Sequence, residues 1–138
     1  MLIKQYPNSA FGGKAFITQP NVVLIDAGGN QLVNDKTSLV FVEIATNPSL
    51  GELSPRSRAR VTVIQGVAQF MNLRIDKSGN NYALKFTLHL PVDNTLTTYE
   101  QTKLFVLGNS FNVYVGILFS LKVVIPPANA IAGAYISV

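Results

Sequence analysis

The sequence predicts an all-β fold, an antiparallel β-sandwich of about seven to nine strands. Short stretches of alternating apolar and polar residues recur along the chain, and turn-forming residues separate them. The 138 residues include 10 Gly and 7 Pro, and only 13% of them are charged. This composition favours short strands and turns over helices, and no segment has the apolar period of an amphipathic helix. The length is sufficient for the core of one domain.

The clearest strand signal is the stretch from Tyr82 to Leu90, which Pro91 ends. One side carries Tyr82, Leu84, Phe86, Leu88 and Leu90, and the other side carries Ala83, Lys85, Thr87 and His89. Successive side chains of a strand point to opposite faces, so the first set is expected in the core and the second in water. We therefore predict a central strand here, with Leu84, Phe86 and Leu88 buried.

The other strand signals are shorter, and turns separate them. Gln65-Gly66 is expected to be a two-residue turn between hairpin partners, and the two glycines in residues 26–30 indicate a second tight turn. Proline and glycine mark residues 46–55 as a loop. The strands expected in this way are Ala15–Thr18, Val22–Ile25, Gln31–Val33, Leu39–Ala45, Ala59–Ile64, Val67–Leu73, Lys103–Leu107 and Phe111–Val115.

Charge and cysteine content exclude several functional classes. The net charge of +4 is spread over a whole domain, so it provides solubility and does not indicate a nucleic-acid partner. The chain has no cysteine, which excludes disulfides, thiolate metal ligands and a cysteine nucleophile. The apolar residues 113–125 are interrupted by Lys122 and followed by Pro126, and they are fewer than the ~20 that span a membrane. We expect no membrane span in this chain.

The two ends of the chain resemble each other. Pro7, Ala10 and Gly13 recur as Pro127, Ala130 and Gly133, and an aromatic residue follows in each case, Phe16 and Tyr135. The repetition indicates that a second copy of the opening strand begins near Pro127. We accordingly divide the chain into a sandwich domain of residues 1–125 and a terminal segment of residues 126–138. In that segment Ile131, Tyr135 and Val138 are expected to contact a neighbouring domain or another copy of the chain.

Turn and core positions carry a resemblance to a known family. The pattern comprises Gln19-Pro20, Val22, Leu24, Asp26-Ala27, Gly29-Asn30, Leu32, Gly51, Leu53, Gly66-Val67-Ala68, Phe70, Leu73, Ile75-Asp76, Gly79, Tyr82, Leu84 and Phe86. In these residues the chain resembles the Ig-like repeats of large cell-surface proteins, which occur in tandem in bacterial adhesins of the invasin and intimin type and in long eukaryotic surface proteins. The resemblance implies an Ig-like sandwich, an extracellular or cell-surface location and neighbouring Ig-like domains as partners. It carries no catalytic residues.

Three arginines alternate after Pro55, namely Arg56, Arg58 and Arg60. On an extended segment their side chains would point the same way and form a stripe for an acidic partner, a sulfated glycan or a phosphate. The alternative is a solvated face whose positive charge prevents edge-to-edge aggregation. The sequence leaves both interpretations open.

The candidate catalytic and metal-binding residues have simpler explanations. His89, the only histidine, lies on the polar side of its expected strand, and no Ser or Cys nucleophile pattern accompanies it. Asp26, Asp76 and Asp93 stand at turns, whereas calcium takes about six to eight oxygen ligands, normally with clustered carboxylates. Turn chemistry accounts for Asp26 and Asp76, because Asp side chains bond nearby backbone amides. We expect no catalysis, no metal and no cofactor.

Three functional hypotheses follow from these observations. The first is a structural or adhesive Ig-like repeat of an extracellular or cell-surface protein, which acts by strand pairing and packing. The second is a self-assembling filament or surface-layer subunit that docks on a copy of itself through its apolar C-terminal segment. The third is a module that binds a cell-surface protein or a glycan through the arginine stripe. An enzyme is the least favoured interpretation.

Overall fold

The computed structural model describes residues 1–90, 104–118 and 120–122. In these residues the chain is all-β, and helix is limited to one 3-10 turn, η1 (Arg56–Arg58). None of the described residues belongs to a helix that is long and apolar enough to cross a membrane. The strands are β1 (Leu2–Gln5), β2 (Ser9–Phe11), β3 (Asn21–Val23), β4 (Leu39–Thr46), β5 (Leu53–Ser54), β6 (Arg60–Thr62), β7 (Val67–Gln69), β8 (Arg74–Ile75), β9 (Gly79–His89), β10 (Phe105–Leu107) and β11 (Phe111–Tyr114).

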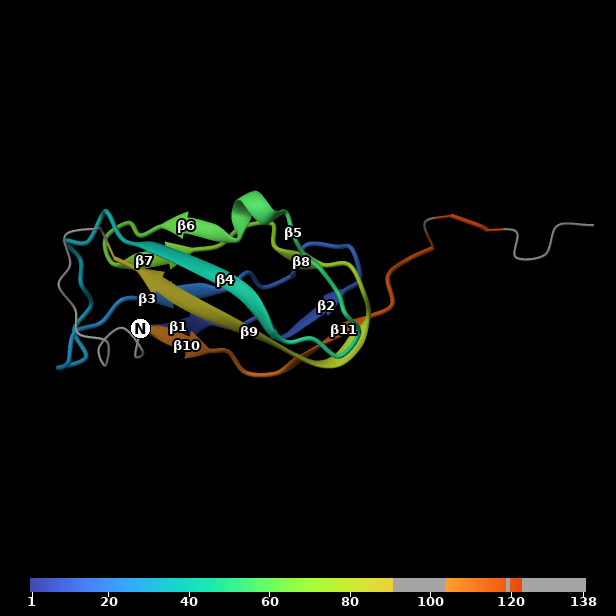
Figure 1. Ribbon diagram of the computed structural model, residues 1–138, viewed down its shortest axis with the longest axis horizontal. Helices are drawn as coiled ribbons and strands as arrows, with labels where there is room; N and C mark the ends of the chain where they lie inside the picture. Colours follow the sequence, from blue (N-terminus) through green and yellow to red (C-terminus); the bar gives the residue numbers. More distant parts are fainter. Residues whose placement is uncertain (91–103, 119, 123–138) are drawn as a thin grey trace, which may run out of the picture.

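The strands form two main sheets and a short ribbon (Figure 1). A three-stranded antiparallel sheet has the order β1-β3-β7. A six-stranded sheet has the order β2-β11-β9-β4-β6, with β10 also paired to β9, and β5 pairs with β8. Within the six-stranded sheet β2 runs parallel to β11, and the other pairs are antiparallel. Strands β1 and β2, which only residues 6–8 separate, therefore belong to different sheets and tie the start of the chain to both.

Apolar side chains from both sheets meet in one core. Ile3 and Val22 of the three-stranded sheet belong to the same buried cluster as Leu84 and Phe86 of β9. The rings of Phe70 and Phe86 lie with their centroids 5.5 Å apart, at a tilted angle that suits aromatic packing. In Figure 1 the long strands β4 and β9 pass in front of β1 and β3, and the core lies between them.

The predicted central strand is confirmed. Strand β9 pairs with β4 along one edge and with β10 and β11 along the other. Tyr82, Leu84 and Phe86 are buried, as their alternation indicates. Leu88 is only half-buried against the core, and it stands next to the last residue of β9, where the strand leaves the sheet. The prediction of full burial is wrong at that position.

The two-residue turn at Gln65-Gly66 is also confirmed. Ile64 and Val67 exchange backbone hydrogen bonds of 2.9 and 3.0 Å. Gln65 and Gly66 have φ of +51° and +75°, which is the backbone of a type I′ turn. The hairpin does not continue beyond this pair, because β6 pairs with β4 in one sheet and β7 with β3 in the other. The turn therefore carries the chain from one sheet to the other, and the prediction that Val67–Leu73 is the hairpin partner of the preceding strand is wrong.

Most of the other expected strands are present with shifted ends. The stretches Val22–Ile25, Leu39–Ala45, Ala59–Ile64, Lys103–Leu107 and Phe111–Val115 correspond to β3, β4, β6, β10 and β11. Lys103 itself lies outside the described residues. The expected loop at residues 46–55 contains the two-residue strand β5.

Two expected strands are wrong, and β1, β2 and β8 were not expected, in addition to β5. Ala15–Thr18 is a loop, although Phe16 is buried and its N–H donates to the Leu73 carbonyl at 2.8 Å. In Gln31–Val33 only Gln31 pairs, through an isolated bridge to Ile25. The strands at the start of the chain are β1 and β2 instead. They are short, and polar residues dilute their apolar pattern, so periodicity does not reveal them.

Candidate functional site

The structure separates the three arginines of the expected stripe. Backbone hydrogen bonds of Pro55 with Arg58 and of Arg56 with Ala59 close a 3-10 turn, so the expectation of an extended segment is wrong. The Arg56 guanidinium lies 3.6 Å from the Glu52 carboxylate, and both side chains are exposed. Arg58 is exposed on the same turn.

Arg60 points to a different surface from the arginines of η1. It begins β6, and its guanidinium carbon lies 5.9 Å from the ring centroid of Phe41 on β4. Val40 and Val42 are buried, so Phe41 between them faces outward from the six-stranded sheet. Arg60 therefore belongs to the outer face of that sheet and does not extend the pair on η1.

Another arginine, far away in the sequence, lies beside η1. Arg74 of β8 pairs with Ser54 of β5, and its Nε donates to Ser54 Oγ at 3.1 Å. Residues 13–16 run along β8 and donate two backbone hydrogen bonds of 2.8 Å to residues 73 and 75. The exposed Lys14 consequently flanks the exposed Arg74. We call Lys14, Arg56, Arg58 and Arg74 the basic ridge.

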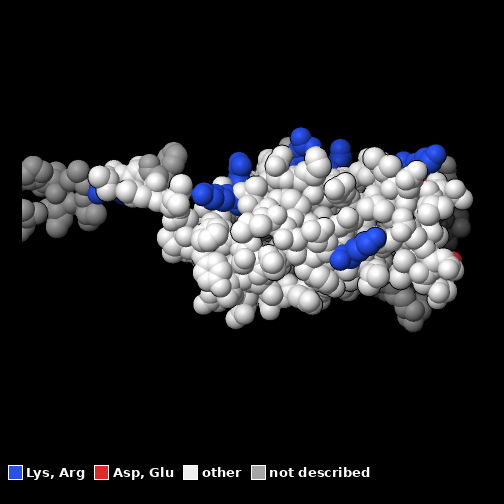
Figure 2. Space-filling view, turned by 180° about the vertical axis from the view of Figure 1, so that it is seen from behind, with Lys and Arg blue, Asp and Glu red and all other residues white. Residues whose placement is uncertain are grey.

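Figure 2 shows Lys and Arg side chains along the upper border of one face of the molecule, where Figure 1 places η1 and β5, and almost no Asp or Glu on that face. The sequence could not indicate Lys14 and Arg74 as partners of the other two, because backbone pairing between distant segments brings them together. A groove of about 440 Å³ adjoins the ridge between β6 and β7. It is lined by Arg58, Val61, Thr62, Ile64, Gln65, Val67, Gln69 and Met71.

The outer face of the six-stranded sheet carries a row of cross-strand pairs. The ring centroids of Phe41 and His89 are 4.2 Å apart, and Lys85 Nζ lies 3.1 Å from the Glu43 carboxylate. A shallow hollow of about 350 Å³ lies over these residues. His89 packs on an aromatic ring at an exposed strand end, which is the position of an ordinary surface histidine.

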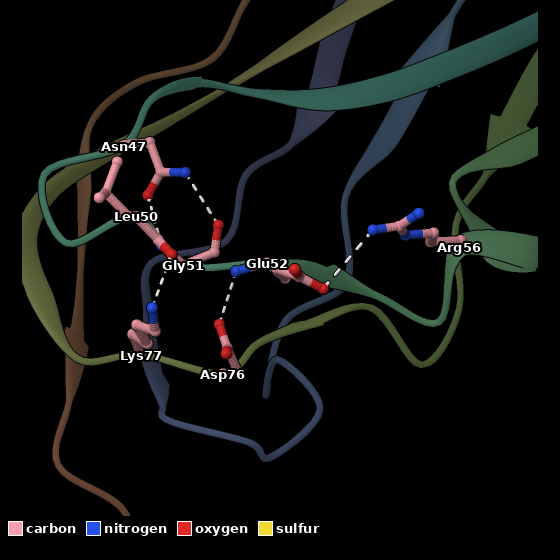
Figure 3. A network of polar contacts seen from close by, with 7 residues as sticks. All are labelled: Asn47, Leu50, Gly51, Glu52, Arg56, Asp76 and Lys77. Carbon is pink, nitrogen blue, oxygen red and sulfur yellow. Dashed lines mark hydrogen bonds and ion pairs between the residues drawn. The ribbon is translucent and has the colours of Figure 1, made fainter.

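Polar contacts join two loops at one end of the molecule (Figure 3). The Asn47 side chain exchanges two hydrogen bonds of 2.8 Å with the backbone of Gly51. The Asp76 carboxylate accepts a bond of 2.5 Å from the Glu52 N–H, and Lys77 Nζ donates to the Leu50 carbonyl at 3.0 Å. These contacts satisfy backbone groups of the loop before β5 and fix it against the turn after β8. The network holds these two loops together.

The carboxylates expected at turns serve the backbone, as predicted for Asp26. Its carboxylate accepts the Gly28 and Asn30 N–H groups at 2.9 and 2.8 Å, and the bonds from Asn30 hold the pKa of Asp26 below its ordinary value. Asp76 bonds across to Glu52 and not within its own turn. Asp93 lies outside the described residues. In the described part of the chain no three His, Cys, Asp or Glu side chains gather where a metal could bind.

Asp35 makes a third carboxylate turn that the sequence did not indicate. Its carboxylate accepts the Ser38 hydroxyl at 2.7 Å and the N–H groups of Thr37 and Ser38 at 3.1 and 3.0 Å. Burial raises the pKa of Asp35, but these hydrogen bonds outweigh burial and hold it below its ordinary value. The turn encloses the Ser38 side chain, which is buried.

An apolar segment leaves the molecule after β11. In Figure 1 residues 115–118 and 120–122, coloured orange to red, run away from the sheets. Four of their side chains are strongly exposed: Val115 by 78%, Ile117 by 74%, Leu118 by 78% and Leu121 by 90%. The later residues for which contacts were expected, Ile131, Tyr135 and Val138, lie outside the described residues, as does the whole segment 126–138.

No family model, no curated protein and no solved structure matches this chain. What the protein does has to be inferred from its own surfaces. Three of them stand out in the described residues: the basic ridge, the outer face of β4 and β9, and the apolar segment after β11.

Proposed function

We propose that the chain is an Ig-like sandwich module. The strand order supports this assignment. In an Ig sandwich one sheet holds strands A, B and E, and the other holds G, F, C and C′. Here β1-β3-β7 corresponds to the first sheet, and β11-β9-β4-β6 corresponds to the second. The chain also crosses between the sheets at Gln65-Gly66, where an Ig sandwich passes from C′ to E when strand D is absent.

The module acts as a structural or adhesive repeat of an extracellular or cell-surface protein, by packing and strand pairing and without catalysis. One observation carries this proposal. The buried apolar residues of the opening segment are Ile3, Pro7, Ala10 and Phe16. At the offset that separates Pro7 from Pro127, the sequence again has apolar residues at all four positions: Val123, Pro127, Ala130 and Ile136. The terminal segment thus carries the core positions of the opening segment of another module.

A segment exchange tests the repeat. In the test chimera the sequence of residues 121–138 replaces residues 1–18, with Gly12 retained because a Cβ there would lie 2.9 Å from the Asp76 carbonyl oxygen. If the segments are equivalent, the chimera unfolds in one cooperative thermal transition, because each core position still receives an apolar side chain. Far-UV circular dichroism measures the transition.

A shifted chimera is the matched control. When residues 120–137 replace residues 1–18, with Gly12 and Gly13 retained, Lys122 falls at the position of Ile3 and Asn129 at the position of Ala10. Composition is nearly unchanged, but polar groups enter the core without partners, and this chimera should not fold. The repeat would be contradicted if the two chimeras melted at the same temperature, or if the test chimera showed no transition.

The second candidate is a self-assembling subunit, and the exposure of Val115, Ile117, Leu118 and Leu121 favours it. Four large exposed apolar side chains so close in the sequence are unusual on a monomer surface and mark sites of association. In this case the segment docks on another copy, and a contact between different surfaces of the two copies leads to open polymers.

Sedimentation velocity separates the two candidates. A subunit that assembles through this segment shows a mass that rises with concentration, and the variant Ile117→Lys/Leu121→Lys remains monomeric. Ile17→Lys is the control, because Ile17 is 73% exposed on another loop and should leave assembly intact. A wild-type chain that stays monomeric at every concentration removes this candidate and leaves the repeat.

A further inference from the structure

We propose that the basic ridge binds a linear anionic polysaccharide. The ridge comprises Lys14, Arg56, Arg58 and Arg74, which come from three segments: the loop after β2, β8 and η1. All four side chains are exposed. The binding test below does not involve the terminal segment, so this inference can fail without the repeat proposal, and the repeat can fail without it.

The charge of the ridge is mostly free for a ligand. In the described residues the ion pairs are Arg56 with Glu52 and Lys85 with Glu43. Arg56 and Glu52 are each more than two-thirds exposed and 3.6 Å apart, so their mutual attraction is weak. Lys14, Arg58 and Arg74 have no carboxylate within ion-pair distance there. The surface is therefore electrostatically complementary to a polyanion.

The spacing of the ridge suits a polymer more than a single anion. Residues 13–16, β8 and β5 lie side by side, and adjacent strands are ~4.8 Å apart, so the backbones that carry Lys14 and η1 are separated by roughly 10 Å. Charges in such a row can each meet one sulfate or carboxylate of a chain laid across the strands. The strands fix the positions, and the bond from Arg74 Nε to Ser54 Oγ orients one guanidinium.

The surroundings favour a sugar polymer over a nucleic acid. Single-stranded nucleic acids are held by aromatic side chains that stack on the bases. In the described residues the exposed large aromatic side chains are Phe11, Phe105 and Tyr114. Phe105 and Tyr114 lie on β10 and β11, and Phe11, whose carbonyl accepts the Lys14 N–H at 3.0 Å, packs its ring on Tyr114 with the centroids 6.1 Å apart. Arg58 instead leads into the groove between β6 and β7, where Thr62, Gln65 and Gln69 offer neutral hydrogen-bonding groups. Such groups match the hydroxyls of a sugar chain.

The test measures binding of a heparin-derived dodecasaccharide to the full chain by titration calorimetry. Gln substitutions at Lys14, Arg58 and Arg74 should each weaken binding about two- to fivefold, since each removes one exposed ion pair. The triple variant should lose roughly tenfold or more if the sites act independently. Binding should weaken as ionic strength rises. Arg74→Lys keeps the charge and should retain most of the affinity.

Arg60→Gln is the matched control, because Arg60 is a neighbour in sequence but packs on Phe41 at another face. Its affinity should equal that of the wild type, and melting curves should show that every variant is folded. The same titration with a polysaccharide that carries carboxylates but no sulfates shows whether the ridge requires sulfate or also accepts carboxylate. The inference is overturned if the dodecasaccharide does not bind, if Arg60→Gln weakens binding as much as Arg58→Gln, or if an oligonucleotide of equal charge binds as tightly.

Discussion

Replacing Phe86 by Ala should strongly destabilise the protein, because Phe86 is at the centre of the core. Its side chain is 1% exposed, and its ring packs against Phe70 at 5.5 Å. Its backbone pairs with Val42 on one side and Val106 on the other, so the strand cannot shift to fill the space. Loss of a buried Phe leaves a cavity and costs about 3–5 kcal/mol. That is a large part of the ~5–15 kcal/mol that stabilises a typical domain.

Urea unfolding monitored by far-UV circular dichroism measures the loss. Phe41→Ala is the control, because Phe41 lies on the adjacent strand but is half-buried on the outer face. We expect that control to cost about 1 kcal/mol, in the usual range for partly exposed positions. A cost below ~1.5 kcal/mol for Phe86→Ala, or equal costs for the two variants, would show that the inward and outward faces of the sheet are assigned wrongly.

Two further predictions concern turns. Gly66→Ala should lower the free energy of unfolding by at least ~2 kcal/mol, and by more than Gly29→Ala does. Both glycines have positive φ, but a Cβ on Gly66 would lie 2.6 Å from the Leu32 carbonyl oxygen, whereas a Cβ on Gly29 meets nothing within 4 Å. Equal urea midpoints for the two variants would contradict this prediction. The pKa of Asp35 is lower in the folded state than its ordinary value of 3.8, so its stabilisation is present above that pH and is lost as the pH falls through the folded-state pKa. Asp35→Asn should therefore lower stability at neutral pH by roughly 1–2 kcal/mol and flatten the fall in melting temperature below pH 3.8, and an unchanged acid profile would show that Asp35 is not involved.

Local patterns predicted the parts of the fold that local chemistry determines. Alternation identified β9 because Tyr82, Leu84 and Phe86 on its inner side are buried, and Gly66 supplied the positive φ of the turn. The start of the chain was misassigned because its structure depends on distant partners. Phe16 is buried although it lies in a loop, because its backbone N–H bonds to the Leu73 carbonyl, and β2 is a strand only because β11 lies beside it. No pattern within those few residues encodes such pairings.

The candidate site shows the same division. The sequence located Arg56 and Arg58 on one exposed segment, but it also assigned Arg60 to them because it took that segment as extended. The 3-10 turn at η1 breaks the alternation on which that assignment depended. Lys14 and Arg74 could not be found in this way, since the pairing of residues 13–16, β8 and β5 is what brings them to η1. Which residues make up the basic ridge therefore depends on how distant strands pair.

The direction of the chain through the module bears on its role. In Figure 1 the N-terminus lies at one end of the molecule, and the segment after β11 leaves at the opposite end. At the exit, Gly12 N–H donates to the Tyr114 carbonyl at 2.8 Å, and a Cβ on Gly116 would lie 2.7 Å from the Gly12 carbonyl oxygen. The corner between β2 and β11 thus sets the course of the departing chain. Modules joined in this way would follow one another end to end, so each would add its full length to an array. That geometry suits a proposed role in which reach and stiffness matter, and it leaves the basic ridge exposed along the side of this module.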